Sequence, residues 1–197
     1  ARALVKLESH RFPVELSELT RAYLGGLAQQ AAGEQRELLA SIARDPADAA
    51  AASRLSADPE YLGILRTTCV ATMLAAGHAP NALAQQAVAT VNCRILPGTR
   101  VDDAQRTLRE VIADPGIEVV LLERYPDAPA SPLREDLFAA VRKAVDLRYP
   151  GLELLPAMAA GATDNLHFRA AGIDSYAITS LFMHPEDDYA HGLDERV

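Results

Sequence analysis

The chain has 197 residues, enough for one sizeable domain or two small ones, and 49% of them are hydrophobic. It carries 27 acidic and 19 basic residues, a net charge of -8, and only 5% aromatic residues. This composition is that of a globular protein and excludes extended disorder, and the missing basic stripe excludes a nucleic-acid partner.

The first third of the chain is rich in alanine and has helical spacing. We expect helices over residues 1–10, 16–27, 34–43 and 48–55, because leucines recur every three or four residues and alanine favours helix. No apolar run approaches the roughly 18–20 residues that cross a bilayer, so we expect no membrane partner. The chain does not begin with Met. We therefore expect it to be a piece of a longer protein, and the sequence does not predict a compartment.

β-Branched residues predict two strands, 65–74 and 87–96. If the chain turns near Asn81, the strands pair antiparallel and place Cys69 almost opposite Cys93. Two cysteines cannot build a disulfide framework or a four-cysteine zinc site. The pattern favours two reduced thiols packed as small apolar residues over a disulfide or a shared metal ion.

A helix is expected over residues 99–113, with Thr99 or Asp102 accepting a hydrogen bond from its first backbone amides. A third strand is expected over residues 117–122. The order strand, strand, helix, strand, together with helix 1–10 and an earlier strand, would complete a split βαβ, ferredoxin-like sandwich.

Residues 127–132 hold two prolines among small residues and mark the best domain boundary. Beyond them the pattern alternates: helix 133–149, strand 152–155, helix 164–171 and strand 175–179. We therefore expect an α/β protein with one domain over residues 1–127 and parallel α/β structure over residues 128–197.

Three places could carry chemistry. The turn formed by Gly161, Thr163 and Asp164 opens a helix, where backbone amides favour anions, although Thr163 or Asp164 could equally be a plain N-cap. Arg94 lies within a strand, so its guanidinium must find a carboxylate or reach solvent. Asn81 alone is typical of a turn.

The third place is the stretch 184–195, which holds two histidines and five carboxylates. Imidazole and carboxylate together are the ligands of zinc and similar ions. A solvated acidic loop is the more ordinary interpretation of the same residues.

Five segments in this order resemble the di-zinc aminoacylase/carboxypeptidase/desuccinylase family, and most nearly its carboxypeptidase S-like branch: residues 67–73, 77–83, 89–98, 161–164 and 185–195. The family has an α/β catalytic domain interrupted by a smaller split βαβ lid that often dimerises. The resemblance implies that residues 1–127 are the lid, with a helical insertion, and that residues 128–197 are the C-terminal part of the catalytic domain.

The resemblance also implies roles for single residues. His191 corresponds to a zinc ligand. Asn81 and Arg94 correspond to lid residues that hold the substrate, Arg94 taking its free carboxylate, a task that suits bidentate arginine. The turn of Gly161, Thr163 and Asp164 corresponds to a loop that lines the substrate pocket.

Family members use two zinc ions and a glutamate that acts as general base on bound water. Their His-x-Asp and Glu-Glu motifs precede the lid, and this chain contains neither. We therefore expect this polypeptide alone to hold at most one zinc ligand and to be inactive. The parent protein is expected to hydrolyse the amide bond of small peptides or N-acyl amino acids with a free carboxylate.

The chain departs from the family at Ala84, where relatives usually have proline, and at Leu166, where they often have arginine. The alternative to a hydrolase is a non-enzymatic dimerisation or interaction module, which would need neither the turn 161–164 nor His191. A sheet with one exposed edge is a ready pairing surface, so we expect a homodimer formed through the lid.

Overall fold

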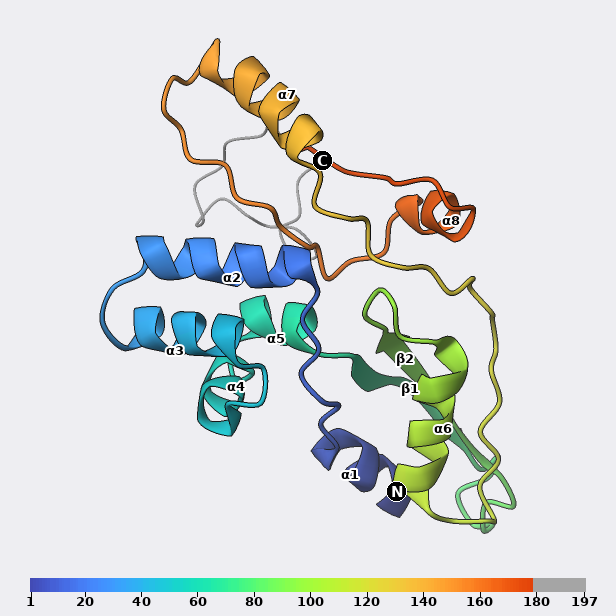
Figure 1. The fold of residues 1–197 in the computed structure, drawn as a ribbon. Coiled ribbons are helices and arrows are strands. Elements are labelled where there is room, and N and C mark those ends of the chain that lie inside the picture. The colour runs from blue at the N-terminus through green and yellow to red at the C-terminus, as the bar shows by residue number, and fades with distance from the viewer. Residues whose placement is uncertain (179–197) are drawn as a thin grey trace.

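The computed structural model describes residues 1–178 as a mixed α/β chain, with eight helices and one two-stranded sheet in that part of the chain (Figure 1). The elements are, in order, α1 (Arg2–Ser9), α2 (Glu18–Gln30), α3 (Gly33–Arg44), α4 (Ala49–Leu55), α5 (Pro59–Leu65), β1 (Thr68–Ala76), β2 (Ala87–Arg94), α6 (Val101–Ile112), α7 (Glu135–Asp146) and α8 (Asn165–Ala170). The α/β class and the helices expected from the sequence are confirmed. No helix among the described residues is long and apolar enough to span a membrane.

Helices α2 to α5 form a helical insertion, residues 18–65, between α1 and the sheet, with a core of its own (Figure 1). Leu24, Ile42 and Leu65 have no exposed surface and form the centre of this core. Helix α5 was not expected from the sequence, and it begins where the Asp58 side chain accepts a hydrogen bond from the Glu60 amide. Capping carboxylates of this kind satisfy amides that a helix leaves unpaired at its first turn.

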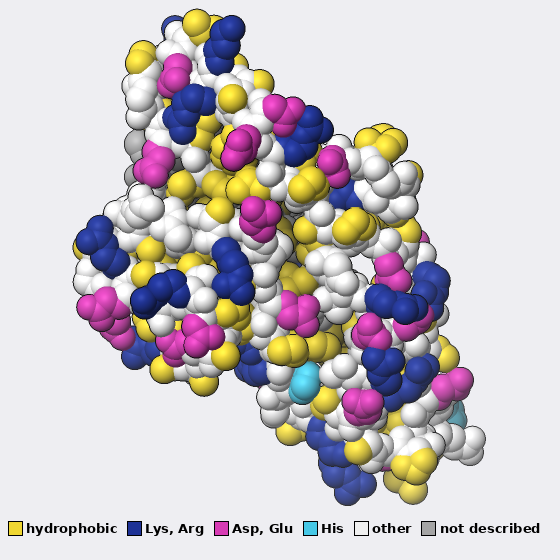
Figure 2. Space-filling model, viewed as in Figure 1, with side chains coloured by type: hydrophobic (Ala, Val, Ile, Leu, Met, Phe, Trp, Pro, Cys, Tyr) yellow, Lys and Arg dark blue, Asp and Glu magenta, His cyan; other side chains and the backbone are white. Residues whose placement is uncertain are grey.

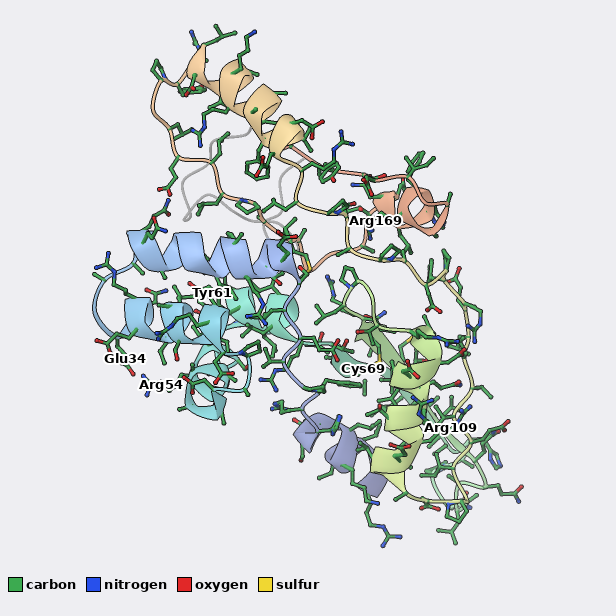
Figure 3. The ribbon with its side chains drawn as sticks, viewed as in Figure 1. Glu34, Arg54, Tyr61, Cys69, Arg109 and Arg169 are labelled. Carbon is green, nitrogen blue, oxygen red and sulfur yellow. A yellow bond between two sulfur atoms is a disulfide. The ribbon has the colours of Figure 1, made fainter. Side chains whose placement is uncertain are left out.

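Polar contacts on the surface of the insertion contribute little to its stability. Glu34 of α3 and Arg54 of α4 form an ion pair of 2.9 Å with both side chains mostly exposed (Figure 3). Such pairs contribute at most about 1 kcal/mol. Gln35 donates to the hydroxyl of Tyr61 at 2.9 Å, which ties α3 to α5.

Strands β1 and β2 pair antiparallel, from Thr68 opposite Arg94 to Ala76 opposite Ala87, with an irregularity between Ala71 and Met73. Helix α6 crosses the sheet, and on the face shown in Figure 2 basic and acidic side chains intermingle over it. The pairing confirms the hairpin that the sequence predicts.

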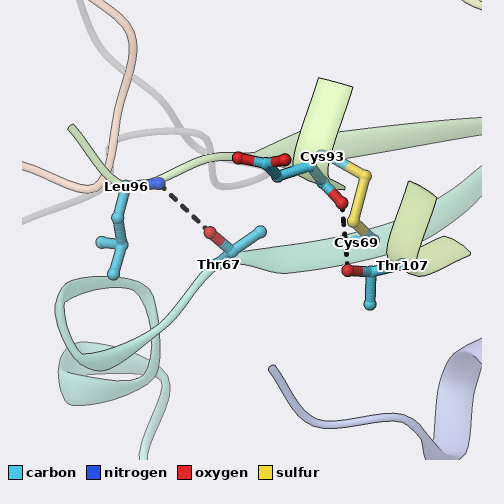
Figure 4. Close-up of a disulfide and its surroundings, with 6 residues drawn as sticks. Thr67, Cys69, Cys93, Leu96 and Thr107 are labelled. Carbon is cyan, nitrogen blue, oxygen red and sulfur yellow. Dashed lines mark hydrogen bonds between the residues drawn. A yellow bond between two sulfur atoms is a disulfide. The ribbon is translucent and has the colours of Figure 1, made fainter. Parts of the chain in front are cut away.

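The two cysteines correct one expectation. Cys69 and Cys93 lie directly opposite each other, as predicted, but they are joined by a disulfide rather than present as reduced thiols. Directly opposed residues of an antiparallel pair have Cβ atoms close enough for two sulfurs to meet. Figure 4 shows the disulfide with Thr107, from the middle of α6, among its surroundings.

Three expected strands do not form among the described residues: 117–122, 152–155 and the described part of 175–179. A strand requires a neighbour for its backbone hydrogen bonds, and within residues 1–178 the only paired strands are β1 and β2. The carbonyl of Val119 instead accepts side-chain hydrogen bonds from Gln105 and Arg109 of α6. The sheet described here is therefore the hairpin alone, flanked by α1 and α6.

The start of α6 also differs from the prediction. Its first amide, that of Val101, donates to the Asp127 side chain at 2.9 Å, so the cap comes from a residue far along the chain rather than from Thr99 or Asp102. Asp102 instead pairs with Arg124, and this hydrogen bond holds the pKa of the Asp102 carboxyl below its usual value.

Candidate functional site

Arg94 is the last residue of β2, and its exposed side chain reaches across to the C-terminal segment. Its Nη1 donates to the carbonyl oxygen of Ala160 at 2.6 Å. A Cβ placed on Gly161 would lie 3.8 Å from the same nitrogen. Two candidates that the sequence identified separately, Arg94 and the turn that begins at Gly161, are thus brought together.

The guanidinium of Arg94 has capacity left for a ligand. It carries five N–H donors in a planar fork, and the contact with Ala160 uses one of them. Among residues 1–178, no carboxylate forms an ion pair with it. An exposed arginine with unused donors can bind a carboxylate through two parallel hydrogen bonds.

Arg66, two residues before β1, differs from Arg94 in its burial. It is buried, and its Nη1 donates to the carbonyl of Phe12 at 2.9 Å. Burial, and secondarily the charge of Arg11, lowers the pKa of the Arg66 guanidinium. Arg66 therefore joins the segment after α1 to the insertion, whereas Arg94 faces outward.

The turn itself presents exposed side chains. Asp164 occupies the N-cap position of α8, but its side chain accepts no capping hydrogen bond. Thr163 is likewise exposed, and its carbonyl accepts from the amide of Leu166 at 3.2 Å. Asp164 is thus the N-cap residue by position, one of the two alternatives considered, but it makes no side-chain capping bond. The roles of Gly161, Thr163 and Asp164 in binding stay predictions.

Asn81 lies far from Arg94 along the hairpin. It is exposed in the loop that joins β1 to β2, at the end where Ala76 faces Ala87, whereas Arg94 is at the opposite end facing Thr68. Within one chain the structure does not bring the two predicted substrate-binding residues together. The role of Asn81 stays a prediction.

The residues described here do not fit a metal centre. In residues 1–178 no group of three or more His, Cys, Asp or Glu side chains could hold a metal ion. His191, the ligand implied by the family resemblance, and the acidic stretch 184–195 lie outside the described residues. We therefore assign no chemical step to zinc.

A shallow pocket of about 250 Å³ lies near the site but does not contain it. Its lining comes from the start of α2, from residues 96–98, and from Ala130 and Met158. Its only ionisable lining residue is Glu15, which accepts a hydrogen bond from Thr99 at 2.9 Å. A pocket with this lining does not match a substrate carboxylate.

Sequence reasoning missed Ala160 and Gly63. Ala160 acts through its backbone carbonyl, which no residue pattern reveals. Gly63 lies inside α5, and a Cβ there would meet the Cβ of Ala160 at 2.7 Å. An isolated glycine within a helix is a signal of close packing, which the sequence offered at this position.

Comparison with known proteins identifies a family domain in the first part of the chain. Residues 1–120 match the model of the peptidase dimerisation domain, M20_dimer. The chain is 29% identical over 145 residues to the N-fatty-acyl-amino acid synthase/hydrolase PM20D1 of Xenopus tropicalis, covering 73% of this chain and 28% of that protein.

Two further relatives have similar identity to the chain and similar coverage. PM20D1 of Homo sapiens is 28% identical over 144 residues, covering 71% of this chain and 29% of that protein. Probable carboxypeptidase S-like 2 of Dictyostelium discoideum is 25% identical over 145 residues, covering 73% and 28%. The matched segment spans less than a third of each of these relatives, and no solved structure gives a significant match. The chain therefore belongs to the M20 peptidase family, whose dimerisation domain its first 120 residues contain.

Proposed function

We propose that this chain is part of a longer metal-dependent hydrolase that cleaves the amide bond of N-acyl amino acids or small peptides. Residues 1–127 serve as its lid and dimerisation domain, and residues 128–197 as the C-terminal part of its catalytic domain. The M20 family match supports this proposal, as do relatives named as an N-fatty-acyl-amino acid synthase/hydrolase and a probable carboxypeptidase S-like protein.

One observation carries the proposal for the substrate. Arg94 lies beside Gly161, is exposed, and uses one of its N–H groups on Ala160. The remaining donors can bind the free carboxylate of an amino acid. We propose that the exposed Thr163 and Asp164, two and three residues after Gly161, contribute to the same binding site.

The metal chemistry of the proposed enzyme belongs to residues outside those described. We propose that His191 supplies one zinc ligand and that the other ligands and the general base come from a part of the protein that precedes this chain. On this proposal the 197-residue polypeptide alone is inactive.

The lid is also proposed to form a homodimer. Val70, Met73 and Leu74 of β1 are each more than 60% exposed, an unusual surface for aliphatic strand residues. A sheet of two strands has unpaired backbone groups at its edges, and a second copy of the lid can cover both features. The family's dimerisation domain supports this arrangement.

A panel of hydrolysis assays on the full-length protein tests the proposed activity. The substrates are N-acyl amino acids with a free carboxylate and the matching carboxamides, and released amine is quantified. We expect turnover of the free acids, much weaker turnover of the carboxamides, and none by residues 1–197 alone. A metal-loaded full-length protein that releases no amine, yet dimerises, would favour the non-enzymatic dimerisation module.

A further inference from the structure

The helical insertion approaches the candidate site through two glycines. A Cβ on Gly63 of α5 would lie 2.7 Å from the Cβ of Ala160, and a Cβ on Gly26 of α2 would lie 2.3 Å from Cδ2 of Leu155. Both distances are well below the roughly 3.5 Å at which carbon atoms make contact. Glycine at these positions lets residues 155–160 pack closely against the insertion.

The two close approaches differ in their consequences. The Leu155 atom is the end of a flexible side chain, which can rotate away from a methyl group on Gly26. Ala160 has no side-chain rotamer to change, so a methyl on Gly63 must displace its backbone. Gly63 is therefore the glycine whose replacement would move the Ala160 carbonyl.

That carbonyl is the acceptor for Arg94. The bond between Nη1 and the Ala160 oxygen is 2.6 Å long. Relieving the contact with Gly63 needs a shift of about 1 Å, and a shift of that size along the bond lengthens it to roughly the 3.5 Å limit of a hydrogen bond. The guanidinium would then lose the acceptor that holds it in one orientation.

We propose that Gly63 is a positioning residue for Arg94, and that the helical insertion thereby sets the geometry in which the enzyme binds the substrate carboxylate. The inference rests on the proposed function, because it takes Arg94 as the residue that binds the carboxylate. It adds a role for the insertion, which packs against the site but contributes no group that touches substrate.

The test compares Gly63→Ala with a matched control, Gly25→Ala, in the full-length protein. Gly25 lies in α2, and a Cβ there would have no atom within 4 Å. Both substitutions raise helix propensity to a similar extent, so they differ mainly in the contact with Ala160. For N-acyl amino acids with a free carboxylate, Gly63→Ala should lower kcat/KM by about tenfold or more, chiefly through KM, and Gly25→Ala should not.

Two further variants separate positioning from general damage. Ala160→Gly removes the methyl group that Gly63→Ala would strike, so the double variant Gly63→Ala/Ala160→Gly should recover the lost kcat/KM. In an Arg94→Ala background, Gly63→Ala should cause no additional loss, because the two residues act through one interaction. Carboxamide substrates should be insensitive to Gly63→Ala.

Amide hydrogen exchange gives a readout that does not depend on activity. Residues 155–164 of the full-length protein should exchange faster in Gly63→Ala than in Gly25→Ala, with protection restored in the double variant. If Gly63→Ala matches Gly25→Ala in both exchange and kinetics, the inference is overturned. The same holds if Gly63→Ala retains its full kinetic loss without Arg94. An inactive wild-type protein would refute the proposed function and with it the role in substrate binding, while exchange would still show whether Gly63 holds the turn.

Discussion

Removal of the disulfide between Cys69 and Cys93 should destabilise the hairpin by several kcal/mol. The two cysteines are separated by 24 residues, and closing a loop of that length lowers the entropy of the unfolded chain. The chain-entropy relation gives about 3.5 kcal/mol at 25 °C for this loop. An isolated two-stranded hairpin is only marginally stable, so the disulfide supplies a large share of the free energy that keeps β1 paired with β2.

The measurement compares the oxidised protein with the double variant Cys69→Ala/Cys93→Ala in guanidinium unfolding followed by circular dichroism. We expect the midpoint to fall in the variant, and to fall similarly when the oxidised protein is treated with reductant. Reductant should have no effect on the variant, which is the control. Two titratable thiols in the native, air-oxidised protein, or coincident midpoints, would refute the reasoning.

Two further changes test the core and a helix cap. Ile42→Ala should lower the free energy of unfolding by about 2–5 kcal/mol, because Ile42 has no exposed surface. Leu147→Ala is the control: this side chain is 85% exposed, so the same denaturation assay should show a change of less than about 0.5 kcal/mol. Asp48→Ala should lower Tm near neutral pH, because the hydrogen bond from the Ser41 hydroxyl and then that from the Ala51 amide hold the pKa of the Asp48 carboxyl below its usual value. Because the pKa of this carboxyl is lower in the folded state than in the unfolded state, its ionised form stabilises the fold fully above the unfolded pKa of about 4. That contribution is lost as the pH falls through the folded-state pKa. The difference in Tm should therefore shrink in acid, and a constant difference down to pH 2 in thermal melts would contradict the assignment.

The helices and the hairpin could be predicted because they depend on local signals. The alanine-rich segments, the leucine spacing and the proline after Asp45 lie within a few residues of the elements they specify. Helix α5 was not predicted because its seven residues are too few to show a clear helical spacing of apolar side chains, although Asp58 and Pro59 are a typical helix start.

The errors arose where long-range partners decide the outcome. The segment 117–122 has strand propensity but no neighbouring strand among the described residues, so its apolar side chains Val120 and Leu122 remain exposed. The disulfide depends on register, and the sequence predicted that register without predicting oxidation. The cap of α6 comes from Asp127, a residue 26 positions away.

The candidate site likewise combines residues that local sequence signals reveal with contacts that only long-range packing decides. Arg94 and the turn at Gly161 could be identified from residue type and order, but their proximity depends on how residues 155–160 pack on α2 and α5. The contribution of Ala160 is a backbone carbonyl and carries no sequence signal. Gly63 is visible in the sequence, yet its meaning depends on what lies opposite.

The most direct test of the account is the ratio of kcat/KM for an N-acyl amino acid to kcat/KM for its carboxamide, measured for the full-length protein and for its Arg94→Ala variant. If Arg94 binds the substrate carboxylate, the ratio is large in the wild type and falls by roughly 10- to 100-fold in the variant, as expected for a lost charge-assisted hydrogen bond of about 1.5–3 kcal/mol. Arg94→Lys should recover part of the preference, because it keeps the charge but not the planar fork. An unchanged ratio in Arg94→Ala would contradict the account.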